Sequence, residues 1–212
     1  MTPFVIAVDG PAASGKGTVA QGLARLYGLP YLDTGLLYRA VGVLSGAVGE
    51  AEAEAAARTL DPTHLENPDL RTRRAGELAS QVAVYPGVRA ALLDFQRAFA
   101  GQTGGAVLDG RDIGTVIAPE APAKLFVTAR PQVRAERRWK QLCGQGETVS
   151  LDEVLADIRL RDERDSQRAA APLVMAQDAA LLDTSDLTIS QAADAAHRIV
   201  EQARARWEIS RG

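Results

Sequence analysis

Short apolar runs alternate with longer amphipathic stretches along most of this 212-residue chain. Residues 4–8 form a continuous apolar run that ends at Asp9-Gly10, as expected for a strand buried on both faces of a parallel sheet. Further short runs of this kind lie at 31–32, 106–108, 125–127 and 181–182. Repeated strand–helix units predict an α/β fold, with a five-stranded parallel sheet and helices on both faces.

The segments between these runs have helical periodicity. After Lys16, Val19, Leu23 and Leu26 recur at spacings of four and three, and Gly28 ends the pattern. Other helices are predicted at about 131–143, 151–166 and 190–207, with an alanine- and glutamate-rich one near 50–58. A chain of 212 residues is ample for one α/β domain, so a single domain spanning 1–212 is expected.

Composition excludes several classes of protein. Apolar residues make up 46% and charged residues 24%, and the formal net charge of -3 argues against nucleic acid or an anionic membrane as partner. No apolar run approaches the ~20 residues that span a bilayer. Cys143 is the only cysteine, so an intrachain disulfide and a thiolate metal site are excluded. A cytoplasmic, monomeric protein is expected.

Residues 9–18, DGPAASGKGT, carry the strongest chemical signal. Gly10 and Gly15-Lys16 match the phosphate-binding pattern G-x-x-x-x-G-K-[ST], but Gly17 stands where the hydroxyl residue is expected and Thr18 follows one position late. The segment follows an apolar strand and opens a helix, which is the context that phosphate binding requires. The alternative is a structural glycine turn with an exposed lysine.

Arginines at the ends of elements suggest a second anion site. Arg39, Arg111 and Arg168 each lie near the end of a predicted strand or helix, from which their side chains can reach the carboxyl edge of the sheet. Joining two polyanions by phosphoryl transfer requires positive charge from separate segments that converge on one cleft. Surface ion pairing is the alternative for any one of them.

Segment 130–168 holds eight arginines and one lysine against eight carboxylates. Such a balance does not suit a nucleic-acid surface, whereas it suits a face that closes over ATP. Arg161, Arg164 and Arg168 share one helical face, as do Arg134 and Arg138 on the preceding helix. Solvated pairs such as Asp157–Arg161 are the alternative.

The loop GPAASGKGT resembles that of nucleoside monophosphate kinases, in which glycine follows the lysine. Further stretches resemble the bacterial cytidylate kinase family in the same order: 33–39 (DTGLLYR), 80–83 (SQVA), 86–89 (PGVR), 109–115 (DGRDIGT), 161–168 (RDERDSQR) and 171–173 (APL). The resemblance runs from residue 4 to about 200. It implies a P-loop NTPase fold of the nucleoside monophosphate kinase type, and transfer of the γ-phosphoryl group of ATP to CMP or dCMP.

The resemblance also implies the site residues. ATP-binding residues would be Gly10, Pro11, Ala12, Ala13, Ser14, Gly15, Lys16, Gly17, Thr18, Arg134 (near the adenine) and Arg138. CMP-binding residues would be Thr34, Tyr38, Arg39, Ser80, Arg89, Asp109, Arg111, Asp112, Arg161, Asp165 and Arg168. The catalytic residues among them would be Lys16, Arg111, Arg161 and Arg168.

Within this set the resemblance assigns the CMP phosphate to Arg39, Arg111 and Arg168, and the ribose to Arg161 and Asp165. Mg²⁺ would bind with ATP without a direct protein ligand, held by phosphates and water, with Asp109 reaching it through water.

Hydrogen-bond chemistry makes the base assignment specific. Cytosine offers an amino donor at C4 and an acceptor at N3, and uracil reverses both. Asp112 can accept from the amino group and Arg89 can donate to N3 or the neighbouring carbonyl, while Ser80 suits either role. Another monophosphate such as UMP, or a non-enzymatic nucleotide switch, remains the alternative. A switch would be expected to carry Ser or Thr after the lysine.

The resemblance divides the domain into a core, a CMP-binding lobe and a lid. The core would comprise 1–38, 100–143 and 172–212, the lobe about 39–99 and the lid about 144–168. The interval 46–79 departs from the family, because it is short and lacks the paired β-branched runs of a small sheet. A trimmed lobe without that sheet is expected.

Overall fold

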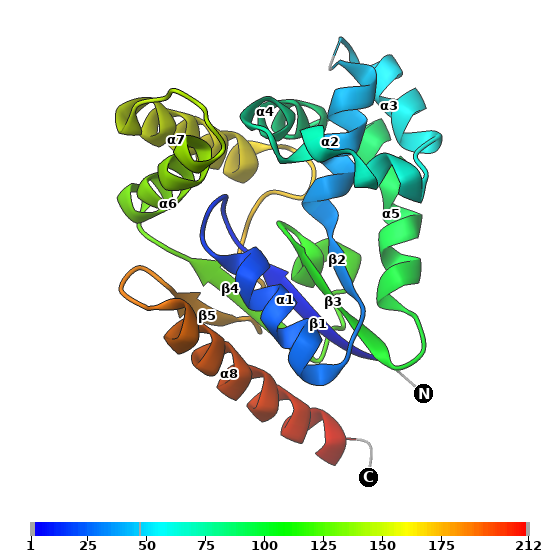
Figure 1. The fold of residues 1–212 in the computed structure, drawn as a ribbon. Helices are drawn as coiled ribbons and strands as arrows, with labels where there is room; N and C mark the ends of the chain where they lie inside the picture. The colour runs from blue at the N-terminus through cyan, green and yellow to red at the C-terminus, as the bar shows by residue number, and fades with distance from the viewer. Residues whose placement is uncertain (1–2, 47, 211–212) are drawn as a thin grey trace.

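The computed structural model describes residues 3–46 and 48–210, and it confirms the five-stranded parallel sheet (Figure 1). The strands are β1 (Phe4–Asp9), β2 (Tyr31–Asp33), β3 (Gly105–Gly110), β4 (Ala123–Thr128) and β5 (Ala180–Asp183), in the order β2-β3-β1-β4-β5. Every neighbouring pair is parallel. Residues 1–2, 47 and 211–212, which the predicted domain ranges include, lie outside the described residues.

The predicted helices are confirmed, each within two residues of its expected ends. The α-helices are α1 (Lys16–Tyr27), α2 (Thr34–Ser45), α3 (Glu50–Arg58), α4 (Arg73–Val82), α5 (Pro86–Ala100), α6 (Pro131–Gly144), α7 (Leu151–Gln167) and α8 (Ile189–Ile209). Short 3₁₀ turns lie at η1 (Pro62–Glu66) and η2 (Pro68–Arg71), and one π-helical turn lies at η3 (Ile113–Ile117). Within the described ranges, no helix could span a bilayer.

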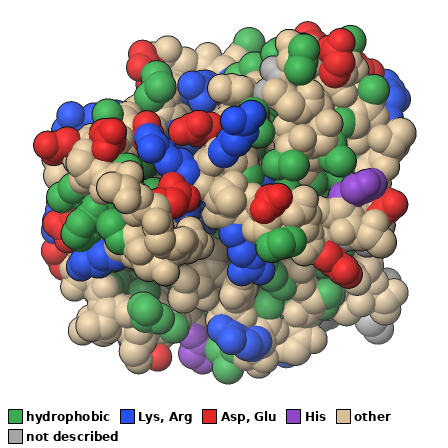
Figure 2. All heavy atoms as spheres, turned by 45° about the horizontal axis from the view of Figure 1, so that its top comes forward, with side chains coloured by type: hydrophobic (Ala, Val, Ile, Leu, Met, Phe, Trp, Pro, Cys, Tyr) green, Lys and Arg blue, Asp and Glu red, His purple; other side chains and the backbone are tan. Residues whose placement is uncertain are grey.

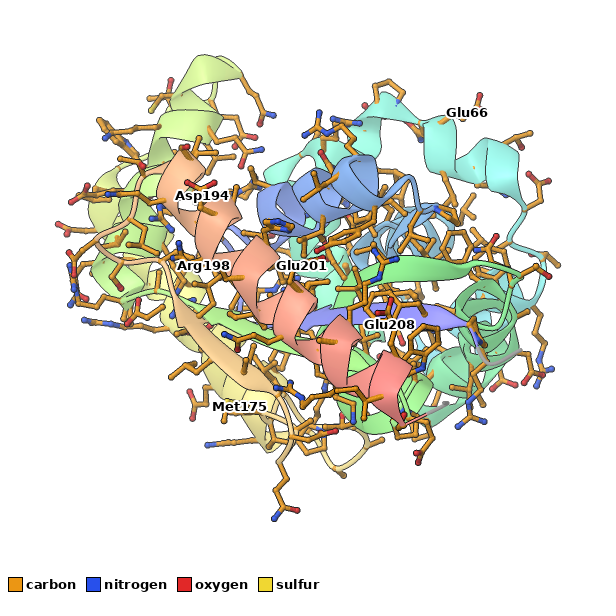
Figure 3. The ribbon with its side chains drawn as sticks, turned by 90° about the horizontal axis from the view of Figure 1, so that it is seen from below. Glu66, Met175, Asp194, Arg198, Glu201 and Glu208 are labelled. Carbon is orange, nitrogen blue, oxygen red and sulfur yellow. The ribbon has the colours of Figure 1, made fainter. Side chains whose placement is uncertain are left out.

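Helices cover both faces of the sheet, as expected from the apolar run of β1. Phe4, Ile6 and Val8 pack on one face with α1 and α8. Val5 and Ala7, which alternate with them, pack on the other face against α5 and η3. Seen from below, α8 runs across the sheet and carries exposed charged residues along its length (Figure 3). The strand is therefore buried on both sides.

Helices α2 to α5 form a lobe with an apolar cluster of its own (Figure 1). Leu37 and Val41 of α2 pack there with Val82 of α4 and Val88 of α5. Between residues 48 and 79 the structure contains helices and turns but no strand, which confirms the trimmed insert predicted from the sequence.

Helices α6 and α7 form a second projection that shares a separate small cluster. Leu142 of α6 contacts Val154 and Ile158 of α7, and all three side chains are buried. The predicted lid boundary at residue 144 therefore falls inside a packed helix pair. A moving unit would have to break this cluster or carry α6 along with it.

Candidate active site

A cleft of about 630 Å³ opens between the α2–α5 lobe and the α6–α7 pair. Its charged lining consists of Lys16, Arg39, Arg71, Arg73, Arg111, Arg138, Arg161 and Arg164 against Asp33, Glu77 and Asp157. Viewed with the top of the molecule turned forward, Lys and Arg side chains lie among Asp and Glu around the hollowed middle of the face (Figure 2). Such an excess of cations suits a polyanionic ligand.

The P-loop joins β1 to α1 at the floor of this cleft. Gly10 has a φ of 151°, and a Cβ there would lie 2.0 Å from the carbonyl oxygen of Val127, so no other residue fits. Gly15 at the N-terminus of α1 adopts a left-handed conformation, with a φ of 89°. Ala13 does the same with a φ of 59°, which is unusual for a residue with a Cβ. The loop therefore follows the strained path that phosphate-binding loops require.

Lys16 begins α1 and points its ammonium group towards Asp109. Its Nζ lies 3.3 Å from Oδ1 of Asp109, which is buried at the end of β3. Tyr31 donates a hydrogen bond to Oδ2 of the same carboxylate over 2.7 Å. Burial lowers the pKa of Lys16, and the Asp109 carboxylate opposes that shift. The lysine is thus held where it can exchange a protein carboxylate for a phosphate.

The glycine after Lys16 has a steric cause. A Cβ at position 17 would lie 3.2 Å from Oδ2 of Asp109, tighter than ordinary van der Waals contact. The serine or threonine of the common motif would therefore press on the carboxylate that faces Lys16. Glycine at position 17 is the residue type that leaves the Asp109 carboxylate undisturbed.

Four cleft arginines come from four separate segments of the chain. Arg39 of α2 donates to the carbonyl oxygens of Leu70 and Thr72 over 2.8 and 3.2 Å. Arg111, just after β3, donates over 2.9 Å to Oδ2 of Asp165 on α7. Arg138 and Arg161 complete the set from α6 and α7.

These arginines are short of counter-charge. Burial, followed by neighbouring cations, lowers the pKa of Arg161 to about 9, and burial lowers that of Arg39 to about 10. Among the described residues, Nε of Arg161 and Nη2 of Arg168 are buried without a hydrogen-bond partner. A bound anion would relieve both the charge repulsion and the missing hydrogen bonds.

The predicted base-binding residues are partly brought together. Arg89 and Asp112 form a buried ion pair, and the Arg89 guanidinium also lies 5.7 Å from the centre of the Tyr38 ring. Arg89 donates to the carbonyl of Ala83 at the end of α4, the helix that carries Ser80. Burial raises the pKa of Asp112 although Arg89 opposes the shift.

Only some of the predicted site residues line the cleft itself. These are Ala12, Ala13, Lys16, Arg39, Ser80, Arg111, Arg138 and Arg161. Arg89 and Asp112 lie outside the lining, paired with each other. Thr34 donates to the carbonyl of Asp109 over 2.8 Å, and Arg168 donates to that of Ala171 over 2.9 Å.

Arg134 does not share the cleft with Arg138. Its side chain is 3% exposed, and its guanidinium donates to the carbonyls of Ala129 and Ala12 and to both oxygens of Asp162. All of its donor groups except one N–H are directed at protein atoms. The structure therefore places Arg134 behind the P-loop instead of beside an open adenine site.

Two residues have contacts at the site that the sequence did not assign to them. Asp9 accepts hydrogen bonds from the backbone N–H groups of Ile113 and Gly114, each over 2.8 Å, and so fixes the segment that follows Arg111 and Asp112. Arg164 of α7 donates to Oγ of Ser80 over 2.9 Å. Their partners are distant in the sequence, so only the position of Asp9 at a strand end could have suggested a function.

The parallel sheet and the P-loop at its carboxyl edge define a P-loop phosphotransferase of the nucleoside monophosphate kinase type. An uncharacterized protein from Eubacterium ventriosum has a similar fold, with a TM-score of 0.57 and 16% identity over 94% of this chain and 99% of that one. At that identity the likeness concerns the fold alone.

Sequence comparisons give the family. The cytidylate kinase family model matches residues 6–203. The cytidylate kinase of Caulobacter sp. (strain K31) is 69% identical over 214 residues, covering 99% of each chain. That of Xanthobacter autotrophicus is 66% identical over 206 residues, covering 95% of this chain and 99% of its own. The chain therefore belongs to the cytidylate kinase family, as the sequence motifs predicted.

Proposed function

We propose that this protein transfers the γ-phosphoryl group of ATP to CMP or dCMP, giving ADP and CDP or dCDP. The cleft carries the proposal, because a P-loop lysine and arginines from separate elements face one cavity. Family membership supports the choice of CMP. In the transfer, a CMP phosphate oxygen forms a bond to the γ-phosphorus while the bond to the bridging oxygen of ADP breaks.

On the donor side, the P-loop residues 10–18 bind the ATP phosphates through backbone N–H groups. Lys16 neutralises the charge on the β- and γ-phosphates, and exchanges Asp109 for them when ATP binds. Arg138 lines the cleft on α6 and is the further donor-side cation. The place of Arg134 near the adenine stays a prediction, and most of its N–H groups are directed at protein partners.

On the acceptor side, Arg39, Arg111 and Arg168 bind the CMP phosphate. Arg161 and Asp165 contact the ribose, and Ser80, Arg89 and Asp112 recognise cytosine, with Thr34, Tyr38 and Asp109 supporting the CMP site. No protein general base is needed because the attacking phosphate is already ionised. The buried Nε of Arg161 and Nη2 of Arg168, which lack hydrogen-bond partners among the described residues, support these assignments, although Nε of Arg161 lies 3.9 Å from Oδ2 of Asp165.

Mg²⁺ is the proposed metal, bound with ATP. Asp109 fits an indirect role, because its Oδ1 is buried and has no hydrogen-bond partner among the described residues, although Lys16 lies 3.3 Å away. The ion would neutralise charge on the phosphates. We further propose that the enzyme is monomeric and cytoplasmic. The net charge of -3 is in accord with the absence of a nucleic-acid or anionic-membrane partner.

A coupled assay that detects ADP tests the proposal. ATP and Mg²⁺ would be combined in turn with CMP, dCMP, UMP, AMP and GMP. CMP and dCMP are expected to be phosphorylated far faster than the others. Equal turnover of UMP and CMP would leave the assignment as a kinase standing but would reject selectivity for cytosine. ATP binding without any phosphoryl transfer would favour the non-enzymatic nucleotide switch.

A further inference from the structure

Two arginines of α6 donate hydrogen bonds to backbone carbonyl oxygens of the P-loop. Arg134 donates to the carbonyl oxygen of Ala12 over 3.2 Å, and Arg137 donates to that of Ser14 over 3.4 Å. Thr184, just after β5, donates from Oγ1 to the same Ser14 carbonyl over 2.8 Å. The two carbonyls flank Ala13, the residue with the left-handed backbone.

These hydrogen bonds decide where the loop directs its N–H groups. In a planar trans peptide the C=O and the following N–H point in opposite directions. Fixing the carbonyls of Ala12 and Ser14 towards α6 therefore turns the N–H groups of Ala13 and Gly15 the other way. A cation at each carbonyl also polarises its peptide and makes that N–H a stronger donor. Both effects favour an anion in the loop.

The support is itself anchored from two directions. Arg137 donates to Oγ1 and to the carbonyl oxygen of Thr184 over 2.9 and 2.7 Å, and the Thr184 N–H donates to Thr128 of β4. Arg134 is fixed by both oxygens of Asp162 on α7. A left-handed alanine is costly and persists only where the surroundings over-determine its backbone.

We propose that Arg137 is a positioning residue for the ATP site, and that with Arg134 and Thr184 it forms a P-loop support. The support keeps the loop in its phosphate-binding shape before ATP arrives. The inference rests on the proposed function, since it takes ATP as the P-loop ligand. A role in folding alone would lower stability without distinguishing between the two substrates.

The test compares ATP affinity with CMP affinity in matched variants. Arg137→Met removes the guanidinium, and Thr184→Val removes at constant shape the hydroxyl that donates to Ser14 and accepts from Arg137. Thr184→Ser restores that donor, and Lys140→Met removes an exposed cation from the same helix. Calorimetry would give the Kd of Mg·ATP, steady-state kinetics the KM of each substrate, and thermal unfolding the stability of each variant.

We expect Arg137→Met to weaken ATP binding about tenfold and Thr184→Val several-fold, by loss of hydrogen bonds to Ser14. The KM for CMP should stay within about twofold. Thr184→Ser and Lys140→Met should bind ATP like the unmodified protein. If Arg137→Met does not fold, the comparison of Thr184→Val with Thr184→Ser still shows whether the P-loop support contributes to ATP affinity.

Unchanged ATP affinity in folded Arg137→Met and Thr184→Val would overturn the P-loop support, as would equal losses for ATP and CMP. An unmodified protein that neither binds ATP nor phosphorylates CMP would instead reject the proposed function. The two failures are therefore separable in one set of measurements.

Discussion

Gly17 shows how a single residue type can be set by its neighbour across the site. We expect Gly17→Ala to displace Asp109 from Lys16, because its methyl group would lie 3.2 Å from the carboxylate. Overpacking of this kind costs about 1–3 kcal/mol, so kcat/KM for ATP should fall roughly tenfold. Gly22→Ala on the same helix is the control, since a Cβ there meets no atom within 4 Å.

Lys16 is the residue on which phosphoryl transfer should depend most. Its removal in Lys16→Ala should lower kcat roughly 10³-fold, a loss of ~4 kcal/mol of transition-state stabilisation. The KM for CMP should barely change because Lys16 faces the donor phosphates. Exposed Lys140, replaced by Ala, should leave both parameters unchanged. Full turnover in the Lys16 variant would reject the P-loop assignment.

Selectivity for cytosine also depends on individual residues. The unmodified protein should prefer CMP to UMP by roughly 10²- to 10⁴-fold in kcat/KM, because uracil would leave Asp112 and Arg89 mismatched. Ser80→Ala should reduce this ratio mildly. Asp112→Ala should lose CMP turnover and also stability, since it leaves Arg89 buried without its counter-ion. A Ser80 variant with no CMP preference left would contradict this division of roles.

The residues proposed to bind phosphate are easier to predict than those that support them. The P-loop motif specified Gly10 and Lys16 because backbone geometry and charge dictate those types at that spacing. For Arg134 the sequence suggests a place near the adenine but not its partners Ala12 and Asp162, which lie 122 and 28 positions away along the chain. Spacing along one helix cannot reveal which side of it a distant loop will cover.

At the scale of elements, α7 meets α4 across the cleft. Asp157 of α7 accepts a hydrogen bond from Nε of Arg73 over 2.9 Å, and Arg164 donates to Ser80 nearby. Because Arg73 and Asp157 are both partly exposed, this ion pair contributes at most about 1 kcal/mol. The two elements should therefore separate readily without nucleotides.

Hydrogen exchange measures that separation. Amides of 151–167 should exchange more slowly when a bisubstrate analogue bridges the cleft, whereas those of β1 should be unaffected. Asp157→Asn should speed exchange in the free protein and little in the complex. Equal protection of α7 with and without the analogue would argue against a moving lid.

Strands and helices followed from apolar periodicity because each element buries one contiguous surface. The lid boundary at residue 144 stays a prediction, because it depends on which helices move together and periodicity does not show that. Gly144 and Gly146 suggest a joint in the sequence, but Leu142 before them and Val154 after them share one cluster. The extent of a moving lid therefore depends on the contacts between helices and not on the glycines that link them.

For the molecule as a whole, Asp9 predicts a pH dependence of stability. Burial raises the pKa of Asp9 to about 6, from its ordinary value of 3.8. Between these values the folded state binds the proton more tightly than the unfolded state, so this group's contribution to the free energy of unfolding falls as pH rises from about 4 to 6. The fall is at most about 3 kcal/mol.

Urea unfolding of the unmodified protein and of Asp9→Asn across this pH range tests the assignment. The variant loses one hydrogen-bond acceptor at every pH, but it cannot ionise. Its stability relative to the unmodified protein should therefore improve as pH rises through 4 to 6. A difference that stays constant with pH would show that Asp9 titrates normally.

The central position of β1 also bears on the order of events during synthesis. Val8 pairs with Asp109 of β3 and with Leu125 of β4, so the first strand made lies between partners more than 100 residues away. At about 5–20 residues per second, the ribosome needs several seconds to deliver them. Throughout that interval the nascent chain presents an apolar strand with both edges free. Chaperone capture of the unfinished chain should end soon after β4 emerges.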